Sequence, residues 1–141
     1  GLANGIEHFH AKAGATAILD VNTGEVVAMA SLPDFDPNQP ADALNPNNIN
    51  RLSVGVYEMG STFKAISLAM ALEANKITLR SVIDARDSLR YGRFTITDYK
   101  GKNRWLSFPE VLAYSSNLGA AHMAETFGPQ RQREFLRSAG M

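Results

Sequence analysis

The most informative part of the sequence is YEMGSTFKAISLAMALEAN, residues 57–75. From residue 63 onward nearly every position is apolar or small, which predicts a helix buried in the centre of its domain. Ser61 and Lys64 stand at the start of that helix. A spacing of three places both side chains on one helix face. We therefore expect a hydroxyl and an amine close enough to exchange a proton.

This pair suits nucleophilic catalysis. A serine attacks only when a neighbouring base takes its proton, and a lysine serves as that base only when its charged form is disfavoured. The positive end of the helix dipole and the apolar surroundings would both disfavour the charge on Lys64. Free N–H groups at the helix start could stabilise an oxyanion beside Ser61. The alternative is that Ser61 only caps the helix and Lys64 only reaches into solvent. The tetrapeptide alone does not decide between the two interpretations.

A second candidate motif is Ser115-Ser116-Asn117, which interrupts two helical stretches. Ser107 and Glu110 have the spacing of a capping box, which predicts a helix running to about Tyr114. A further helix is expected from residue 118 until Gly128-Pro129. We expect Ser116 only to cap this second helix.

The clearest sheet signal lies near the N-terminus. Residues 15–21 and 25–30 favour strands, and residues 22–24 (Asn-Thr-Gly) form a turn between them, which predicts a hairpin. Before it, residues 6–13 show the spacing of a short helix ending at Gly14. After it, residues 32–50 hold four of the six prolines and are expected to be irregular.

Taken together, these segments resemble a known family. Residues 57–64 followed by an apolar helix resemble the active-serine segment (S-x-x-K) of penicillin-binding proteins, and Ser115-Ser116-Asn117 is similar to their second motif, S-x-N. The hairpin is similar to the strand pair that opens their transpeptidase domain. The resemblance covers roughly residues 14–128, and residues 54–60 look most like the class B, cell-division branch. It implies an α+β fold of the β-lactamase and penicillin-binding transpeptidase type, with residues 1–141 forming part of one such domain.

The resemblance implies roles for four residues. Ser61 would attack the carbonyl between the two terminal D-alanines of a peptidoglycan stem peptide and form an acyl-enzyme, while Lys64 takes its proton. Ser115 would relay a proton to the departing nitrogen, and Asn117 would hold Lys64 and the substrate amide by hydrogen bonds. β-Lactams would acylate the same serine. No metal or organic cofactor is expected.

One family motif is missing. No lysine in the sequence is followed by Thr-Gly or Ser-Gly, so the third motif, K-T-G or K-S-G, is absent. In the family this motif lies on a strand in the C-terminal part of a five-stranded sheet. We therefore expect the chain to be a piece of a longer protein. The three C-terminal strands of the sheet would lie outside this piece. Alone, it is expected to be inactive or weakly active.

Two other functions stay open. Ser61-Thr62-Phe63-Lys64 also suits class D β-lactamases and β-lactam sensors of the same fold. Those proteins usually carry S-x-V as the second motif, so Asn117 favours the transpeptidase. The other alternative is a non-catalytic module that binds partners in the cell-wall machinery, in which Ser61 would not react.

Composition excludes several other classes. Fourteen Lys and Arg balance fourteen Asp and Glu, which argues against nucleic acid as a partner. Trp105, which lies among basic residues, is predicted to be a buried aromatic in an exposed loop. The absence of cysteine excludes disulfides and thiol catalysis. His8, His10 and His122 lack partners at ligand spacing, so no metal site is predicted.

The resemblance also implies a location and partners. The longest apolar run, residues 65–72, is far shorter than the roughly 20 residues that span a bilayer. We expect a protein of the inner membrane with its catalytic domain on the periplasmic side and an anchor outside this chain. The implied partners are stem peptides, β-lactams and membrane proteins of division or elongation.

Overall fold

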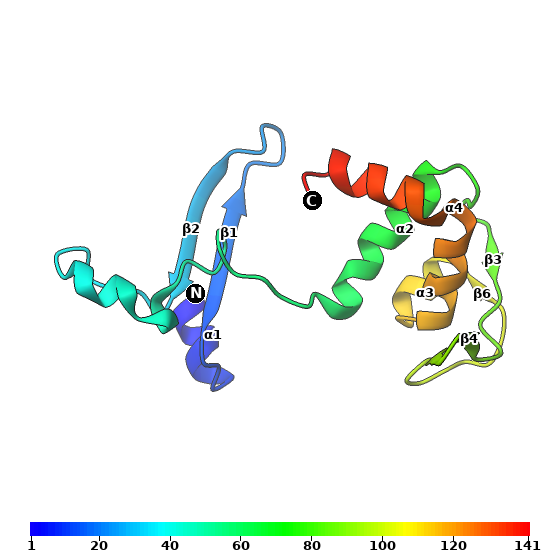
Figure 1. Ribbon diagram of the computed structural model, residues 1–141, viewed down its shortest axis with the longest axis horizontal. Coiled ribbons are helices and arrows are strands. Elements are labelled where there is room, and N and C mark those ends of the chain that lie inside the picture. Colours follow the sequence, from blue (N-terminus) through cyan, green and yellow to red (C-terminus); the bar gives the residue numbers. More distant parts are fainter. The chain divides into compact units, whose positions relative to one another are not determined.

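The computed structural model describes residues 1–141, which form two compact units, Gly1–Glu58 and Met59–Met141. The first unit is built around an antiparallel hairpin of β1 (Gly14–Leu19) and β2 (Val26–Leu32), which lie side by side in Figure 1. The Asp20 carboxylate accepts hydrogen bonds from the N–H groups of Asn22 and Thr23 at 2.7 and 3.1 Å and so fixes the turn. The predicted hairpin is confirmed, and β2 extends two residues further than expected.

The N-terminal helix begins and ends earlier than the sequence predicts. Helix α1 (Leu2–His8) ends well before Gly14, because His10 takes a left-handed conformation with φ 50°. The helix packs against the base of the hairpin, where a β-carbon on Gly14 would come 2.9 Å from the Leu2 side chain. After the hairpin the chain forms only two short 3-10 turns, η1 (Pro40–Leu44) and η2 (Pro46–Asn48). The predicted irregular segment is thus confirmed.

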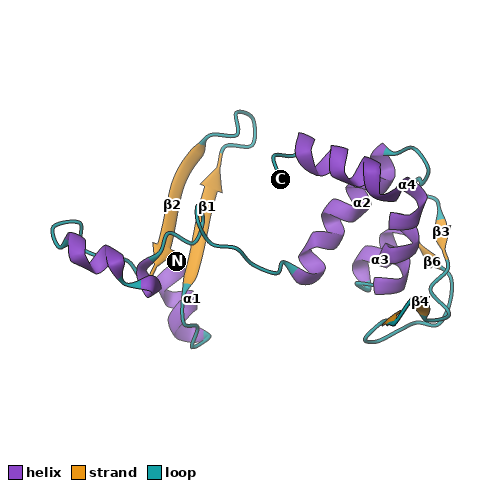
Figure 2. Cartoon of the chain, in the orientation of Figure 1, coloured by secondary structure: helices purple, strands orange, loops and turns teal.

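The second unit is mainly helical, with short strand pairs beside the helices (Figure 2). Its elements, in chain order, are η3 (Gly60–Thr62), α2 (Phe63–Glu73), β3 (Val82–Ile83), β4 (Leu89–Tyr91), β5 (Phe94–Ile96), β6 (Leu106–Ser107), α3 (Phe108–Ala113) and α4 (Asn117–Ser138). Strand β3 pairs with β6 and β4 pairs with β5, both antiparallel. None of the helices is both long enough and apolar enough to cross a membrane.

The hydrophobic core lies in this second unit, where α2, α3 and α4 meet. Its buried members are Leu68, Met70, Ala71, Ile77, Ile83, Ala85, Leu106, Phe108, Val111, Leu118, Met123 and Phe127. Helix α2 buries only one side within the unit, since Ala65 and Ala69 are exposed. The expectation of a helix enclosed on all sides is therefore wrong for this chain, because α3 and α4 cover α2 from one direction only.

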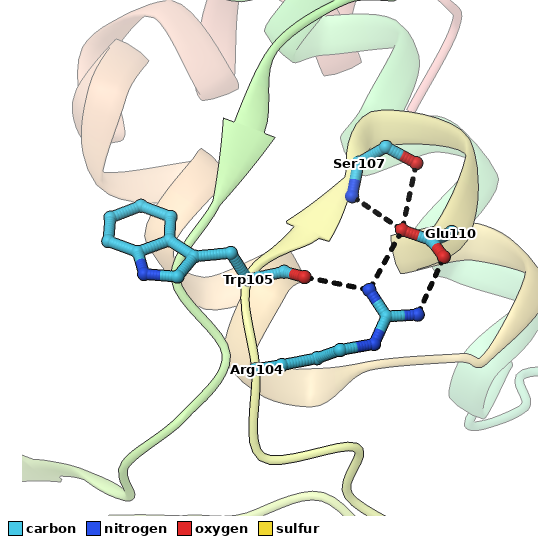
Figure 3. A network of polar contacts seen from close by, with 4 residues as sticks. All are labelled: Arg104, Trp105, Ser107 and Glu110. Carbon is cyan, nitrogen blue, oxygen red and sulfur yellow. Dashed lines mark hydrogen bonds and ion pairs between the residues drawn. The ribbon is translucent and has the colours of Figure 1, made fainter.

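The start of α3 is fixed by a polar network (Figure 3). The Glu110 carboxylate accepts a hydrogen bond from the backbone N–H of Ser107 at 2.8 Å, as the predicted capping box requires. The Ser107 hydroxyl donates to the same carboxylate at 3.0 Å. The Arg104 guanidinium binds the same carboxylate at 2.7 Å and also donates to the carbonyl of Trp105. Trp105 itself is 48% exposed and has the Arg86 guanidinium over its ring. The prediction of a buried Trp105 is wrong, because about half of this residue remains exposed to solvent.

Helix α4 is broken in its second half. Gly128 adopts φ 70° and ψ 171°, outside the helical region, and Pro129 starts a second helical stretch. The sequence predicts a helix end at this point, and the structure has a kink there. Beyond the kink, the Arg131 guanidinium donates to the Ala74 carbonyl at the end of α2, at 3.2 Å.

Candidate active site

The first motif lies where η3 passes into α2. Gly60 has φ 54°, a left-handed conformation that favours glycine, and the chain turns there into the helical segment. Ser61 follows within the 3-10 turn and Lys64 lies in the first turn of α2. The first N–H groups of a helical segment have no acceptor within it. The N–H of Ser61 is therefore available for an external oxygen atom.

The Lys64 amine joins the two motifs. Its Nζ lies 3.1 Å from Ser61 Oγ, 3.0 Å from Ser115 Oγ and 2.6 Å from the Ser115 carbonyl oxygen. All three distances are within hydrogen-bond range. Residues 61 and 115, far apart in sequence, thus share one amine. The structure brings together three of the four predicted site residues.

Ser115 is held in a left-handed turn that ends α3. Its φ is 53°. Its N–H donates to the Leu112 carbonyl at 3.0 Å, and the next N–H, of Ser116, donates to the Val111 carbonyl at 2.9 Å. These two bonds form a Schellman motif, in which the left-handed position is usually glycine. Here that position carries the hydroxyl that contacts Lys64.

Asn117, the fourth predicted residue, begins α4 but does not contact Lys64. Its side-chain nitrogen donates to the Thr97 carbonyl at 2.8 Å. The expected hydrogen bond from Asn117 to Lys64 is absent, because Thr97 holds the amide group instead. The Asn117 side-chain oxygen accepts no hydrogen bond from the chain.

The sequence did not reveal Asp98. Its carboxylate accepts hydrogen bonds from the Ser116 hydroxyl at 2.7 Å and from the N–H groups of Asn117 and Leu118 at 2.5 and 3.0 Å. The Ser116 hydroxyl in turn accepts from the Gly119 N–H at 2.9 Å, which confirms it as a helix cap. The only sequence signal for Asp98 was an aspartate directly after a strand, and nothing local links it to a helix that starts nineteen residues later.

The surroundings of Lys64 favour the neutral amine, which is the form that can accept a proton. Burial lowers the pKa of Lys64 below the ordinary lysine value of 10.5, and the negative charge of Asp98 opposes this shift. No carboxylate forms an ion pair with Lys64. A lysine without a direct anionic partner loses its proton more readily than a paired one.

Ser61, Lys64 and Ser115 form a cluster on an open face of the second unit, since Ser61 and Ser115 are both exposed. A hollow of about 510 Å³ in the same unit, lined by residues that include Ile83, Trp105 and His122, contains no member of this cluster. No group of three or more acidic or histidine side chains is placed to hold a metal ion.

Known proteins are similar to this chain in sequence and in fold. Residues 14–141 match the family described as the penicillin binding protein transpeptidase domain. The chain is 39% identical over 140 residues to the probable peptidoglycan D,D-transpeptidase FtsI of Caulobacter vibrioides, covering 99% of this chain and 24% of that protein. It is 31% identical over 133 residues to the peptidoglycan D,D-transpeptidase FtsI of Escherichia coli, covering 87% and 21%. The chain thus spans less than a quarter of the length of either relative.

Two solved structures are also similar. One, described as a peptidoglycan glycosyltransferase from Burkholderia ambifaria, matches with a TM-score of 0.83 and 30% identity over 99% of this chain and 40% of that one. The other is the apo TP domain of penicillin-binding protein 3 from Burkholderia pseudomallei, with a TM-score of 0.77 and 30% identity over 94% and 36%. These matches confirm the expected α+β transpeptidase fold. The chain belongs to the class B penicillin-binding protein transpeptidase family.

Proposed function

We propose that this chain carries the nucleophile and the base of a peptidoglycan D,D-transpeptidase that works through a serine acyl-enzyme and is inhibited by β-lactams. The observation that supports this most directly is the Lys64 amine, shared between the hydroxyls of Ser61 and Ser115. The names of the relatives, peptidoglycan D,D-transpeptidases, support the substrate class. We also propose that both compact units belong to one transpeptidase domain.

The three contacts of Lys64 suit a neutral amine. An uncharged lysine offers two N–H donors and one lone pair, and the Ser115 carbonyl can only accept. If the second donor goes to the Ser115 hydroxyl, the lone pair faces Ser61. Lys64 is then placed to take the Ser61 proton, and the Ser115 hydroxyl hydrogen is free to point toward a leaving group.

The proposed reaction has two steps, acylation of Ser61 and transfer of the acyl group to an amine. Ser61 Oγ forms an ester bond to the carbonyl carbon between the two D-alanines, and the carbon–nitrogen bond to the last D-alanine breaks. The Ser61 proton passes to Lys64 and through Ser115 to the departing nitrogen. An amine of a neighbouring stem peptide then attacks the ester carbonyl carbon and the bond from that carbon to Ser61 Oγ breaks. The proton that the amine gives up passes through Lys64 to Ser61 Oγ, which restores the hydroxyl and the neutral lysine. The Ser61 N–H supplies one donor to the oxyanion.

Asn117 keeps only one of the two contacts that the resemblance implies, the one to the substrate amide. Because Thr97 binds its nitrogen, the side-chain oxygen is the group left for a ligand. We propose that this oxygen accepts a hydrogen bond from an amide N–H of the stem peptide. Asn117 would therefore orient the substrate without touching Lys64.

The relatives also suggest where the whole protein works. Two relatives are named FtsI, so we propose a role in cell division, beside other membrane proteins of the division machinery. Peptidoglycan stem peptides lie outside the cytoplasmic membrane. We propose that the intact protein is anchored in the inner membrane with this domain on the periplasmic side.

Intact-mass measurement tests the proposal. The full-length protein that carries this sequence is expected to gain one penicilloyl group from benzylpenicillin, and Ser61→Ala to gain none. Ser67→Ala is the matched control, because the Ser67 hydroxyl bonds only the Phe63 carbonyl within α2, and it should keep the adduct. An adduct that survives Ser61→Ala would refute the assignment.

The same experiment separates the transpeptidase from a β-lactamase and from a non-catalytic module. A class D-like β-lactamase would release the penicilloyl group rapidly, whereas a transpeptidase keeps it long enough to be weighed. A non-catalytic module would never form it. For residues 1–141 alone we expect slow acylation or none, because the sequence has no K-T-G or K-S-G triplet.

A further inference from the structure

The Ser115 turn needs support from outside α3. A non-glycine residue in the left-handed region is sterically unfavourable, and it persists only where the surroundings fix it. On one side the Schellman bonds to Val111 and Leu112 supply that support. On the other side the chain enters α4 directly, so the start of α4 must be fixed as well.

Asp98 supplies this second support. Its two carboxylate oxygens receive three hydrogen bonds from consecutive residues, namely the hydroxyl of Ser116 and the N–H groups of Asn117 and Leu118. Ser116 is 1% exposed, so its hydroxyl has no water to replace this partner. The neighbouring Thr97 carbonyl adds a fourth bond, from the Asn117 side chain. The segment after β5 is thus fastened to the first turn of α4.

We propose that Asp98 is a positioning residue of this site: its carboxylate clamps the first turn of α4, holds the Ser115 turn against Lys64, and keeps a negative charge near the lysine without contacting it. The inference rests on the proposed function, because it concerns how the Ser61–Lys64 pair is kept ready to react. Asp98 does not touch the reacting atoms. It acts through Ser115 and through its charge.

The positional effect follows from the contacts of Lys64. Two of its three partners are atoms of Ser115, and the contact to the carbonyl oxygen is the shortest of the three. A movement of the turn would therefore shift Lys64 relative to Ser61. A displacement of about 1 Å in a catalytic group can reduce a rate about 100-fold.

The charge has a separate and opposite effect. Asp98 favours the protonated form of Lys64 and so raises its pKa, against the stronger effect of burial. Other titratable groups on the surrounding segments are Tyr99, Lys100, Lys102 and Tyr114, and Asp98 is the one whose charge shifts the pKa of Lys64. Removing the charge should lower the pKa of Lys64, so that the neutral amine persists to lower pH.

Three variants separate the two effects. Asp98→Asn keeps one oxygen for the N–H groups of Asn117 and Leu118 but removes the charge. Asp98→Ala removes both. Ser116→Ala removes one bond of the clamp and leaves the charge. Asp87→Asn, an exposed aspartate whose side chain makes no hydrogen bond, is the matched control.

The measurement is the rate constant for acylation of Ser61 by a fluorescent penicillin, recorded against pH in the full-length protein. Asp98→Ala is expected to lose about 100-fold. Asp98→Asn should lose less, and the acid limb of its profile should move to lower pH. Ser116→Ala should lower the rate without moving that limb. Asp87→Asn should match the wild type in both respects.

Each contrary result has a clear meaning. If Ser61 is acylated and both Asp98 variants keep the wild-type rate and pH profile, the inference is wrong while the proposed function stands. A loss of rate in both variants with an unmoved acid limb would make Asp98 a purely structural cap, and would equally overturn the inference. If the wild type forms no adduct at Ser61, both proposals fall. Should Asp98→Ala not fold, the profile of Asp98→Asn decides alone.

Discussion

Gly119 of α4 lies so close to Val111 of α3 that a β-carbon on the glycine would stand 2.6 Å from Val111 Cγ2 and 2.8 Å from Cγ1. Val111 has no exposed surface, and a close-packed core gives it no room to move aside. The missing side chain at residue 119 therefore allows α4 to start directly beside α3. The Ser115 turn that connects the two helices depends on this contact.

We expect Gly119→Ala to lower the free energy of unfolding by about 1–3 kcal/mol, as overpacking in a core usually does. Alanine is otherwise the better helix former by about 1 kcal/mol, so the expected sign is opposite to the helix propensity. Urea denaturation measures it. Gly5→Ala in α1 is the matched control, because a β-carbon there meets nothing within 4 Å. That control should be neutral or stabilising, and equal effects of the two changes would contradict the packing argument.

The left-handed conformation of Ser115 predicts that stability and reactivity separate at this residue. Ser115→Gly and Ser115→Ala both remove the hydroxyl held by Lys64, so both should lose acylation by penicillin. Only glycine relieves the backbone, and we expect it to be more stable than the alanine variant by about 1 kcal/mol. Thermal unfolding of the two proteins gives the comparison. An alanine variant as stable as the glycine variant would show that the turn is not strained.

The proposed role of Lys64 as a base predicts that its protonation state controls the rate of acylation. Acylation should rise with pH as Lys64 becomes neutral, with a midpoint below the ordinary lysine pKa of 10.5, because burial lowers the pKa of this amine. Lys64→Arg should abolish acylation, since a guanidinium keeps its proton throughout. Lys76→Arg, at an exposed lysine beyond the end of α2, is the control and should leave the profile unchanged. Acylation by Lys64→Arg at the wild-type rate would remove Lys64 from the base role.

The contacts of Glu110 with Arg104 and Ser107 predict how the stability of the second unit falls in acid. Hydrogen bonds from Arg104 and Ser107 lower the pKa of Glu110 from 4.5 to about 2. Because the folded-state pKa is the lower one, the stabilisation is complete above pH 4.5 and is lost as the pH falls toward about 2. Glu110→Gln should therefore be less stable than the wild type at neutral pH, and the difference in melting temperature should shrink over that range.

The control for Glu110 is Glu73→Gln, because the Glu73 carboxylate makes no hydrogen bond within the chain. This variant should follow the wild-type melting temperature at every pH. A Glu110→Gln protein that melts with the wild type at neutral pH would mean that the capping network adds nothing to stability.

The elements that the sequence predicts well are those fixed by local chemistry. The hairpin follows from a turn that Asp20 can close by itself, and the start of α3 follows from the Ser107–Glu110 spacing. The contact between Ser61 and Lys64 follows from helix geometry. In each of these cases the interacting groups lie within a few residues of each other.

The features that the sequence does not predict depend on partners far along the chain. The clamp by Asp98 joins residues 19 positions apart, and Thr97 binds the Asn117 side chain across 20 positions. No periodicity in the sequence indicates either contact. The half-exposed Trp105 and the one-sided burial of α2 depend on what packs against a segment. Hydropathy describes only the segment itself.

The backbone at residue 115 also affects how this protein would respond to selection. Variants chosen only for resistance to heat would accumulate glycine there, because it fits the turn better than serine does. Such a population would be well folded in every biophysical assay and yet have lost the Ser115 hydroxyl from the cluster that it forms with Ser61 and Lys64. A screen for robust forms of this protein therefore has to score a chemical event at Ser61 in the same round.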